Sequence, residues 1–290
     1  MSGASIEASG HSVYGNSEAP APPSLLLKFS LKGKTAIVTS AGAGMGLVVA
    51  NGLAEAGANV ALWYNTNTNC LERAQEITVK HGVQAKAYQV DITNAEAVKQ
   101  AVEQSVKDFN GRLDIFIANA GIPWAQAPAV DGPLAQYSDI MDIDLNATYY
   151  CAKYAAHYWR KQKDEGVDLN GNKIENFTFG SFVATASMSG HIGNVSQLQA
   201  AYNAARSGVI HLCKSLAIQW VKFARANTVS PGYAANESSS FIPKDTQNKD
   251  LMGREGRAEE LKGAYLYLAS DASSYTTAFD IVVDGESCAP

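Results

Sequence analysis

Charged residues are sparse in this chain, and acidic residues outnumber basic ones. Lysine and arginine number 23 against 28 aspartates and glutamates, which gives a formal charge of −5, and the sequence contains no basic run. A protein that binds a phosphate backbone needs such a run to displace counterions. The composition therefore argues against nucleic acid as a partner.

Cysteine is scarce as well. The four cysteines, Cys70, Cys151, Cys213 and Cys288, stand far apart, with no Cys-x-x-Cys pair and no histidine at ligand spacing. Disulfide frameworks and zinc sites both need cysteines at regular short spacings. We predict reduced thiols that serve packing, and no metal site.

Long apolar runs are lacking too. No stretch approaches the roughly 18 to 20 apolar residues that a membrane span requires, and the N-terminus has neither the basic start nor the apolar core of a secretory leader. We therefore expect a soluble, cytoplasmic protein with no membrane partner.

Residues 1–30 differ in composition from the rest of the chain. They are rich in serine, glycine, alanine and proline, and the run Ala19–Pro23 disfavours both helix and strand. We predict a flexible N-terminal arm over residues 1–30 and a single domain over 31–290. The apolar run Leu25–Leu27 could dock the arm onto the domain or a neighbouring subunit; a loosely held tail is the alternative.

From Lys34 onwards, short β-branched runs alternate with longer helical patterns. This alternation is typical of an α/β fold, and seven strands fit one Rossmann-type, doubly wound parallel sheet. The predicted strands are Thr35–Thr39, Asn59–Tyr64, Ala85–Val90, Leu113–Ala118, Phe177–Thr185, Arg225–Ser230 and Phe279–Val283. The predicted helices are Gly46–Gly57, Cys70–His81, Ala95–Phe109, Ala135–Arg160, Ala200–Lys222 and Ala258–Ala269, with a polar surface loop over Lys161–Asn176.

A glycine-rich loop follows the first predicted strand directly. Gly42, Gly44 and Gly46 lie within Thr39–Gly46, which opens the first predicted helix. In a strand-loop-helix unit, such glycines let backbone N–H groups and the helix N-terminus approach a pyrophosphate. The loop therefore favours a dinucleotide site; an ordinary turn is the alternative reading.

The end of the second predicted strand carries no acid. An NAD site has a carboxylate there for the ribose 2′-hydroxyl, whereas this chain has Tyr64 followed by Asn65 and Thr66. Neutral donors do not repel a 2′-phosphate, so Asn65 and Thr66 favour NADP(H). Alternatively, these residues only cap the next helix.

Three polar residues near the middle of the chain form a candidate catalytic group. Ser187 follows an apolar strand, and Tyr202 and Arg206 lie four apart on a predicted helix, hence on one face. A fixed cation stabilises a phenolate, and a serine hydroxyl can hold a carbonyl oxygen. The group suits hydride transfer to a ketone; a Tyr–Arg surface pair is the alternative.

In order and spacing, these motifs resemble the short-chain dehydrogenase/reductase family from Leu31 to the C-terminus. The resemblance rests on the glycine loop, Asn119-Ala120-Gly121, Asn146, Ser187, Tyr202 and Ser230-Pro231-Gly232. Thr185–Asn194, His211–Ala217 and Leu261–Thr277 look most like fungal NADP-dependent mannitol dehydrogenases, sorbose reductases and related carbonyl reductases. The resemblance implies a Rossmann fold and a homotetramer assembled partly through the helices Ala135–Arg160 and Ala200–Lys222.

The resemblance also implies roles for individual residues. Tyr202 would be the general acid, Ser187 would orient the substrate oxygen, and Asn146 would hold a relay water. The cofactor contacts would be Ser40, Gly42, Gly44, Met45, Gly46, Asp91, Ile92, Asn119, Gly121, Pro231, Gly232 and Asn236, and the substrate pocket would contain Trp124, His191, Tyr233 and Phe241. Structural readings remain for several of these residues: Asn146 and Asp91 could cap helices, and Pro231-Gly232 could be a turn.

The chain departs from the family pattern at functional positions. Ser40 and Glu286 stand where the family has glycine, Asn236 replaces a threonine, and the segment Ser238–Met252 is shorter. Arg206 replaces the family's lysine and keeps its charge, but it cannot release a proton. We therefore expect Arg206→Lys to raise turnover.

The sequence thus predicts an NADP(H)-dependent oxidoreductase that interconverts a small-molecule ketone and alcohol, with a place in fungal secondary metabolism. Two alternatives stay open. One is a non-redox isomerase or cyclase on the same scaffold, and the other is a non-catalytic structural subunit.

Overall fold

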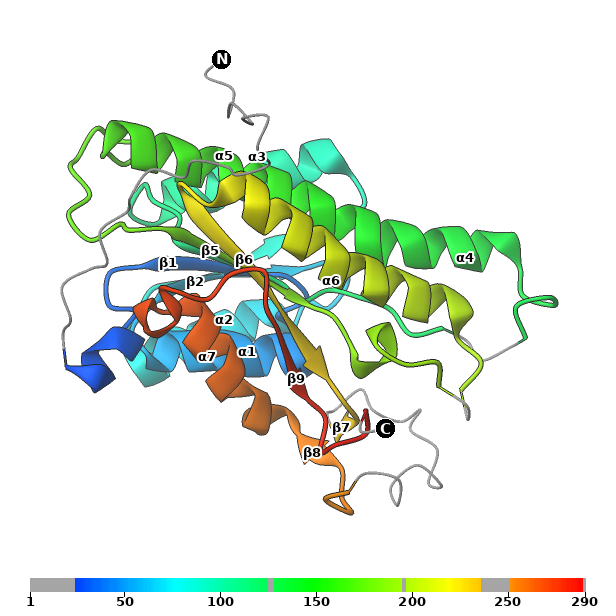
Figure 1. Ribbon diagram of the computed structural model, residues 1–290. Coiled ribbons are helices and arrows are strands. Elements are labelled where there is room, and N and C mark those ends of the chain that lie inside the picture. Colours follow the sequence, from blue (N-terminus) through cyan, green and yellow to red (C-terminus); the bar gives the residue numbers. More distant parts are fainter. Residues whose placement is uncertain (1–23, 125–127, 195–196, 236–250, 289–290) are drawn as a thin grey trace, which may run out of the picture.

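The computed structural model describes residues 24–124, 128–194, 197–235 and 251–288. Its centre is one parallel sheet of seven strands in the order β3-β2-β1-β4-β5-β6-β9, flanked by helices on both faces (Figure 1). This confirms the predicted doubly wound fold. The strand order reverses between β1 and β4, the place where such sheets open a ligand crevice at their carboxyl ends.

The strands are short, and the two at the centre of the sheet are mostly apolar. β1 and β4 are buried at every position, because helices cover both faces of the sheet. The strands span β1 (Thr35–Val38), β2 (Asn59–Tyr64), β3 (Ala85–Gln89), β4 (Ile115–Ala118), β5 (Gly180–Thr185), β6 (Ala224–Pro231) and β9 (Asp280–Val283). The sequence analysis did not foresee a two-residue parallel pair, β7 (Ala234–Ala235) with β8 (Gly256–Arg257).

Seven α-helices lie within the described ranges: α1 (Gly44–Glu55), α2 (Cys70–His81), α3 (Ala95–Asp108), α4 (Leu134–Ile140), α5 (Ala147–Glu165), α6 (Ala200–Trp220) and α7 (Lys262–Ala269). α3, α5 and α6 cover one face of the sheet over an aromatic core that includes Trp63, Phe116 and Phe182. α1, α2 and α7 cover the other face, where Leu53, Leu62 and Tyr265 are buried. None of the described helices is long and apolar enough to cross a membrane.

The long helix predicted over Ala135–Arg160 is interrupted. α4 and α5 are joined by a π-helical turn, Met141–Asn146, and α5 continues to Glu165 before Gly166 ends it with a positive φ of 69°. The polar loop therefore begins later than predicted. A π turn widens the helix locally, often at functional sites, and this one carries Asp144 into the protein interior.

Residues at the N-terminal boundary are only partly described. Leu25–Phe29 form a short 3₁₀ helix with exposed leucines, and Leu31 is fully buried, its N–H bonded to the carbonyl of Ala56. The first 23 residues of the predicted arm lie outside the described residues, so the arm stays a prediction.

All four cysteines are free thiols. Burial raises the pKa of Cys70 to about 11, and it raises those of Cys151 and Cys213 as well. These three thiols stay protonated at neutral pH and pack as small apolar side chains.

Candidate active site

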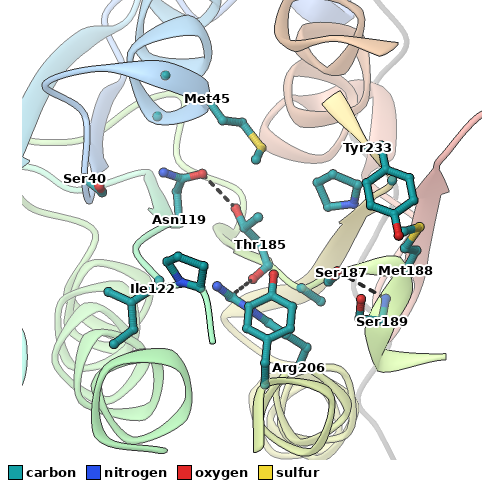
Figure 2. A pocket seen from close by; sticks show the side chains of 18 of the residues that line it. Ser40, Met45, Asn119, Ile122, Thr185, Ser187, Met188, Ser189, Arg206 and Tyr233 are labelled. Atoms are coloured by element: carbon teal, nitrogen blue, oxygen red, sulfur yellow. Dashed lines mark hydrogen bonds between the residues drawn. The ribbon is translucent and has the colours of Figure 1, made fainter. Parts of the chain in front are cut away.

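Two adjoining cavities open at the carboxyl ends of the central strands. The larger, about 380 Å³, runs from the start of α1 across the ends of β4, β5 and β6 to α6 (Figure 2). The smaller, about 160 Å³, lies against the ends of β2 and β3. Ser40, Gly121 and Ile122 line both cavities. Together they form an elongated site at the switch point of the sheet.

The start of α1 faces the larger cavity. Gly44, Met45 and Gly46 line it, and no side chain caps this helix, so its first N–H groups remain available to an anion. A Cβ on Gly46 would overlap the carbonyl oxygen of Ser40 and lie 2.7 Å from Asn119 Nδ2. Gly42 lines neither cavity; it packs against the start of α2 instead.

Two non-glycine residues at family glycine positions adopt left-handed backbone. Ser40 has φ 54° and Glu286 has φ 73°. An L-residue in this region carries strain of about 1–2 kcal/mol that glycine avoids. Ser40 and Glu286 therefore adopt the left-handed backbone conformation that favours glycine, although neither residue is a glycine.

We expect Ser40→Gly to raise the free energy of unfolding by about 0.5–1 kcal/mol, because relief of the strained φ outweighs the added freedom of the unfolded chain. Urea denaturation measures this change. Ser40→Ala is the matched control, since it removes the hydroxyl and keeps the Cβ. An equal gain for the alanine variant would show that φ is not the cause.

The smaller cavity contains several of the residues predicted to contact the cofactor. Asn65, Asp91 and Ile92 line it, and the Asp91 carboxylate accepts hydrogen bonds from the backbone and hydroxyl of Thr93. Thr66 lines neither cavity. The end of β2 presents an amide to this cavity rather than a carboxylate.

Hydrogen bonds join the strand ends beneath the site. Asn119 donates from its side chain to the carbonyl of Thr39 and accepts from the hydroxyl of Thr185 at 3.2 Å. The Thr185 hydroxyl also lies 2.6 Å from that of the buried Tyr265 in α7. Figure 2 shows Thr185 between Asn119 and Arg206. This network fixes the floor of the larger cavity.

The structure brings Ser187, Tyr202 and Arg206 together in the larger cavity. Ser187 follows β5, and its Oγ accepts the N–H of Ser189 at 3.1 Å, which leaves its own proton free to donate. Tyr202 and Arg206 lie one turn apart on α6, and the guanidinium carbon is 5.1 Å from the centre of the Tyr202 ring. A hydroxyl, a phenol and a cation thus meet at one cavity wall.

Arg206 is held by main chain and by an acid. Its Nη1 donates to the carbonyl of Thr185 at 2.7 Å, and its Nη2 lies 3.1 Å from a carboxylate oxygen of Asp144. The guanidinium also packs closely against Gly121, where any Cβ would overlap Nη2. This contact explains why the position after Ala120 must be glycine.

Asn146 does not line either cavity. Its amide donates to Asp142 at 2.8 Å on an exposed part of the helix, so the structure does not bring it to the other candidate residues. Asp144, two residues earlier, is fully buried and accepts the N–H of Ile122 at 2.9 Å. Sequence reasoning missed Asp144. The available signal was Arg206, because a buried guanidinium requires a counter-charge.

Only some of the predicted substrate-pocket residues line the larger cavity. Tyr233 lines the larger cavity, and so do Pro231 and Gly232 at the end of β6. Trp124 is buried in a small cluster that also contains Tyr202, outside the cavity lining. His191 lies 2.6 Å from Asp280 and likewise does not line the cavity. Asn236 and Phe241 lie outside the described residues.

Polar residues that the sequence analysis did not select complete the wall near Tyr233. Its hydroxyl donates to Gln197 at 3.2 Å, and Gln199 donates to the hydroxyl of Ser189 at 3.0 Å. All four residues line the larger cavity. Glutamines in an irregular segment give no local sequence signal, because only the fold turns Gln197 and Gln199 towards the site.

Comparison with known proteins gives consistent matches over nearly the whole chain. Residues 40–285 match a family model described as enoyl-(acyl carrier protein) reductase. An L-xylulose reductase of Hypocrea jecorina is 52% identical over 94% of this chain and 96% of its own. A probable NADP-dependent mannitol dehydrogenase of Yarrowia lipolytica is 50% identical over 92% of this chain and 91% of its own.

A solved structure with similar architecture has also been found. It is the NADPH-dependent 3-quinuclidinone reductase of Rhodotorula rubra, with a TM-score of 0.86 and 39% identity over 96% of this chain and 99% of the other. The similarity therefore extends over the sheet and both helical layers.

Proposed function

Because this chain belongs to the short-chain dehydrogenase/reductase family of oxidoreductases, we propose that it is an NADP(H)-dependent carbonyl reductase acting on an open-chain ketose or, in reverse, on a polyol. The observation that carries the proposal is the meeting of Ser187, Tyr202 and Arg206 in one cavity beside the glycine loop. Relatives named for xylulose and mannitol support this substrate class.

The residues present fit NADP(H). Gly46 leaves the space that the backbone approach requires, the uncapped start of α1 can receive a pyrophosphate, and Asn65 replaces the acid that would repel a 2′-phosphate. Asp91 and Ile92 would hold the adenine side, and Asn119 and Gly121 would line the ribose side. When bound, NADPH supplies a hydride to the carbonyl carbon.

The protein's own residues handle the carbonyl oxygen and the proton. The free O–H of Ser187 donates a hydrogen bond to that oxygen and fixes its position. Tyr202 transfers its phenol proton to the oxygen as negative charge develops there. Arg206, next to the ring, stabilises the phenolate that remains until solvent returns the proton.

The polar wall of Ser189, Gln197, Gln199 and Tyr233 suits a polyhydroxylated substrate. It presents hydroxyl and amide groups that can both donate and accept, close to the proton donor Tyr202. Such a site discriminates strongly against analogues that lack hydroxyls, since its own polar groups would be left unpaired. This supports a sugar rather than an apolar ketone.

Calorimetric titration with each cofactor tests the cofactor proposal. We expect micromolar binding of NADPH and at least about tenfold weaker binding of NADH, because a charge-assisted contact to the 2′-phosphate contributes roughly 1.5–3 kcal/mol. Absence of binding to either cofactor would contradict the proposed redox chemistry.

The turnover test uses L-xylulose as oxidant with NADPH, and mannitol as reductant with NADP⁺. Loss of NADPH absorbance and a product heavier by two hydrogens support reduction. A product of unchanged mass would support the isomerase or cyclase alternative, and binding without any turnover would support a structural subunit. A place in fungal secondary metabolism stays a prediction, and no observation favours it over sugar metabolism.

We also propose a cytoplasmic homotetramer with residues 1–30 as an arm outside the domain of residues 31–290. The exposed face of α5 and α6 supports self-association, since a groove of about 760 Å³ there is lined by aromatic side chains that include Tyr149, Tyr154, Tyr158 and Trp220. Aromatic residues of this kind are enriched at subunit contacts.

A further inference from the structure

We propose that Asp144 is a positioning residue that holds the Arg206 guanidinium in place and offsets its charge beside Tyr202, so that positions 144 and 206 act as one unit. The inference rests on the proposed reductase function and deepens it. Neither the glycine loop nor the Ser187–Tyr202 pair accounts for a buried acid at this wall.

Asp144 contacts two elements that line the active site, the loop after β4 and helix α6. Its Oδ1 accepts the N–H of Ile122, in the loop after β4, and its Oδ2 lies 3.1 Å from Arg206 Nη2 on α6. Asp144 is 0% exposed and Arg206 is 4% exposed. The π-helical turn is what brings the carboxylate to this depth, because it shifts the helix face by one residue.

The ion pair leaves hydrogen-bonding capacity unused. Within the described residues, neither Asp144 Oδ2 nor Arg206 Nε makes a hydrogen bond. Geometry therefore does not lock the pair in the bidentate form that gives the strongest Arg–carboxylate contacts. Its main effect is electrostatic: each partner is the counter-charge that allows the other to be buried.

The charges of the two groups are mutually dependent. Burial raises the pKa of Asp144, and the charge of Arg206 opposes that rise. Burial acts to lower the pKa of Arg206, but the negative charges that Tyr202 and Asp144 can carry outweigh it, so the pKa is raised. Tyr265 of α7 also faces the guanidinium and acts in the same direction.

The fork of the guanidinium is necessary for this arrangement. Arg206 reaches the carbonyl of Thr185 with Nη1 and Asp144 with Nη2 at the same time. The single ammonium of a lysine would be drawn to the carboxylate and would leave the Thr185 carbonyl unpaired. With Asp144 in place, we therefore expect Arg206→Lys to lower turnover, the reverse of what the sequence alone suggested.

A double-mutant cycle tests the unit through NADPH-dependent reduction of L-xylulose. We expect Asp144→Asn and Arg206→Lys each to lower kcat about 10–100-fold, and the double variant to recover to within about tenfold of the wild type. The double change removes the carboxylate that would draw the lysine ammonium away, and it keeps a positive charge at position 206. Losses that simply add, in an active wild type, would overturn the inference and leave the proposed function intact.

The pH profile separates positioning from mere stability. Without the carboxylate, the charge of Arg206 next to the Tyr202 ring is uncompensated, so the alkaline limb of the kcat profile should move to lower pH in Asp144→Asn. Asp114→Asn is the control, since it breaks the buried Arg112–Asp114 pair at the opposite end of the sheet. It should lower the melting temperature without moving the limb.

The inference would be overturned if the alkaline limb of the kcat profile did not shift in Asp144→Asn, or if it shifted equally in Asp114→Asn. NADPH affinity and circular dichroism of every variant show whether the fold and the cofactor site persist. A wild type that binds NADPH and turns over neither L-xylulose nor mannitol would overturn the proposed function, and the role of Asp144 with it.

Discussion

We expect Tyr202→Phe to lower kcat for NADPH-dependent ketose reduction about 10²–10⁴-fold, the range that general acid catalysis contributes, and to leave NADPH affinity within about twofold. The phenol is the proposed proton donor, and it lines the larger cavity next to Ser187 and Arg206. The ring itself packs against the small buried cluster that contains Trp124 and Ile140, so phenylalanine keeps that packing. Stopped-flow NADPH absorbance and calorimetry measure the two quantities.

Tyr233→Phe is the matched control for this loss. Tyr233 lines the same cavity, and its hydroxyl bonds Gln197 rather than the catalytic group. Removal of this hydroxyl should raise KM and change kcat less than about tenfold, because as a pocket residue it would contact the substrate in the ground state and the transition state alike. Turnover retained in Tyr202→Phe, or lost equally in Tyr233→Phe, would contradict the assignment of the proton donor.

The sheet could be predicted because its signals are local. β1 and β4 read as short β-branched runs bounded by turn residues, and burial on both faces leaves no polar alternation to confuse them. β7 and β8 gave no such signal, because two residues are too few for a period. Their pairing depends on a contact between segments about 20 residues apart.

The π-helical turn was beyond sequence reasoning for a related physical reason. Apolar spacing over 134–165 fits one regular helix, and a single inserted residue changes that spacing too little to detect. The consequence is large, since residues two apart point to nearly opposite sides of a helix. Asn146 therefore faces away from the site, and Asp144 faces the protein interior beside Arg206.

The candidate site was predictable where a motif fixes both residue type and backbone. Ser187, Tyr202 and Arg206 follow from the end of a strand and one turn of a helix, and the structure brings them into one cavity. His191 shows the limit. Its partner Asp280 lies 89 residues away in the chain, and only the completed sheet places the two side chains together.

Gly46→Ala should abolish micromolar NADPH binding, with a loss of at least about 100-fold in affinity, and lower the free energy of unfolding by about 2 kcal/mol, as overpacking does. The added Cβ meets the main-chain oxygen of Ser40, which cannot rotate away, and crowds the Asn119 amide at 2.7 Å. Relief requires the whole glycine loop to move. That movement closes the space where the pyrophosphate would approach α1.

Gly263→Ala is the matched control, because it places the same Cβ near the start of a helix, α7, with no atom within 4 Å. Alanine is the better helix former, so this variant should gain up to about 1 kcal/mol and bind NADPH unchanged. Urea denaturation and calorimetry on both variants isolate the clash from the substitution itself. Unchanged NADPH affinity in Gly46→Ala would show that the cofactor does not bind at the start of α1. It would also remove the main reason to interpret this cavity as a dinucleotide site.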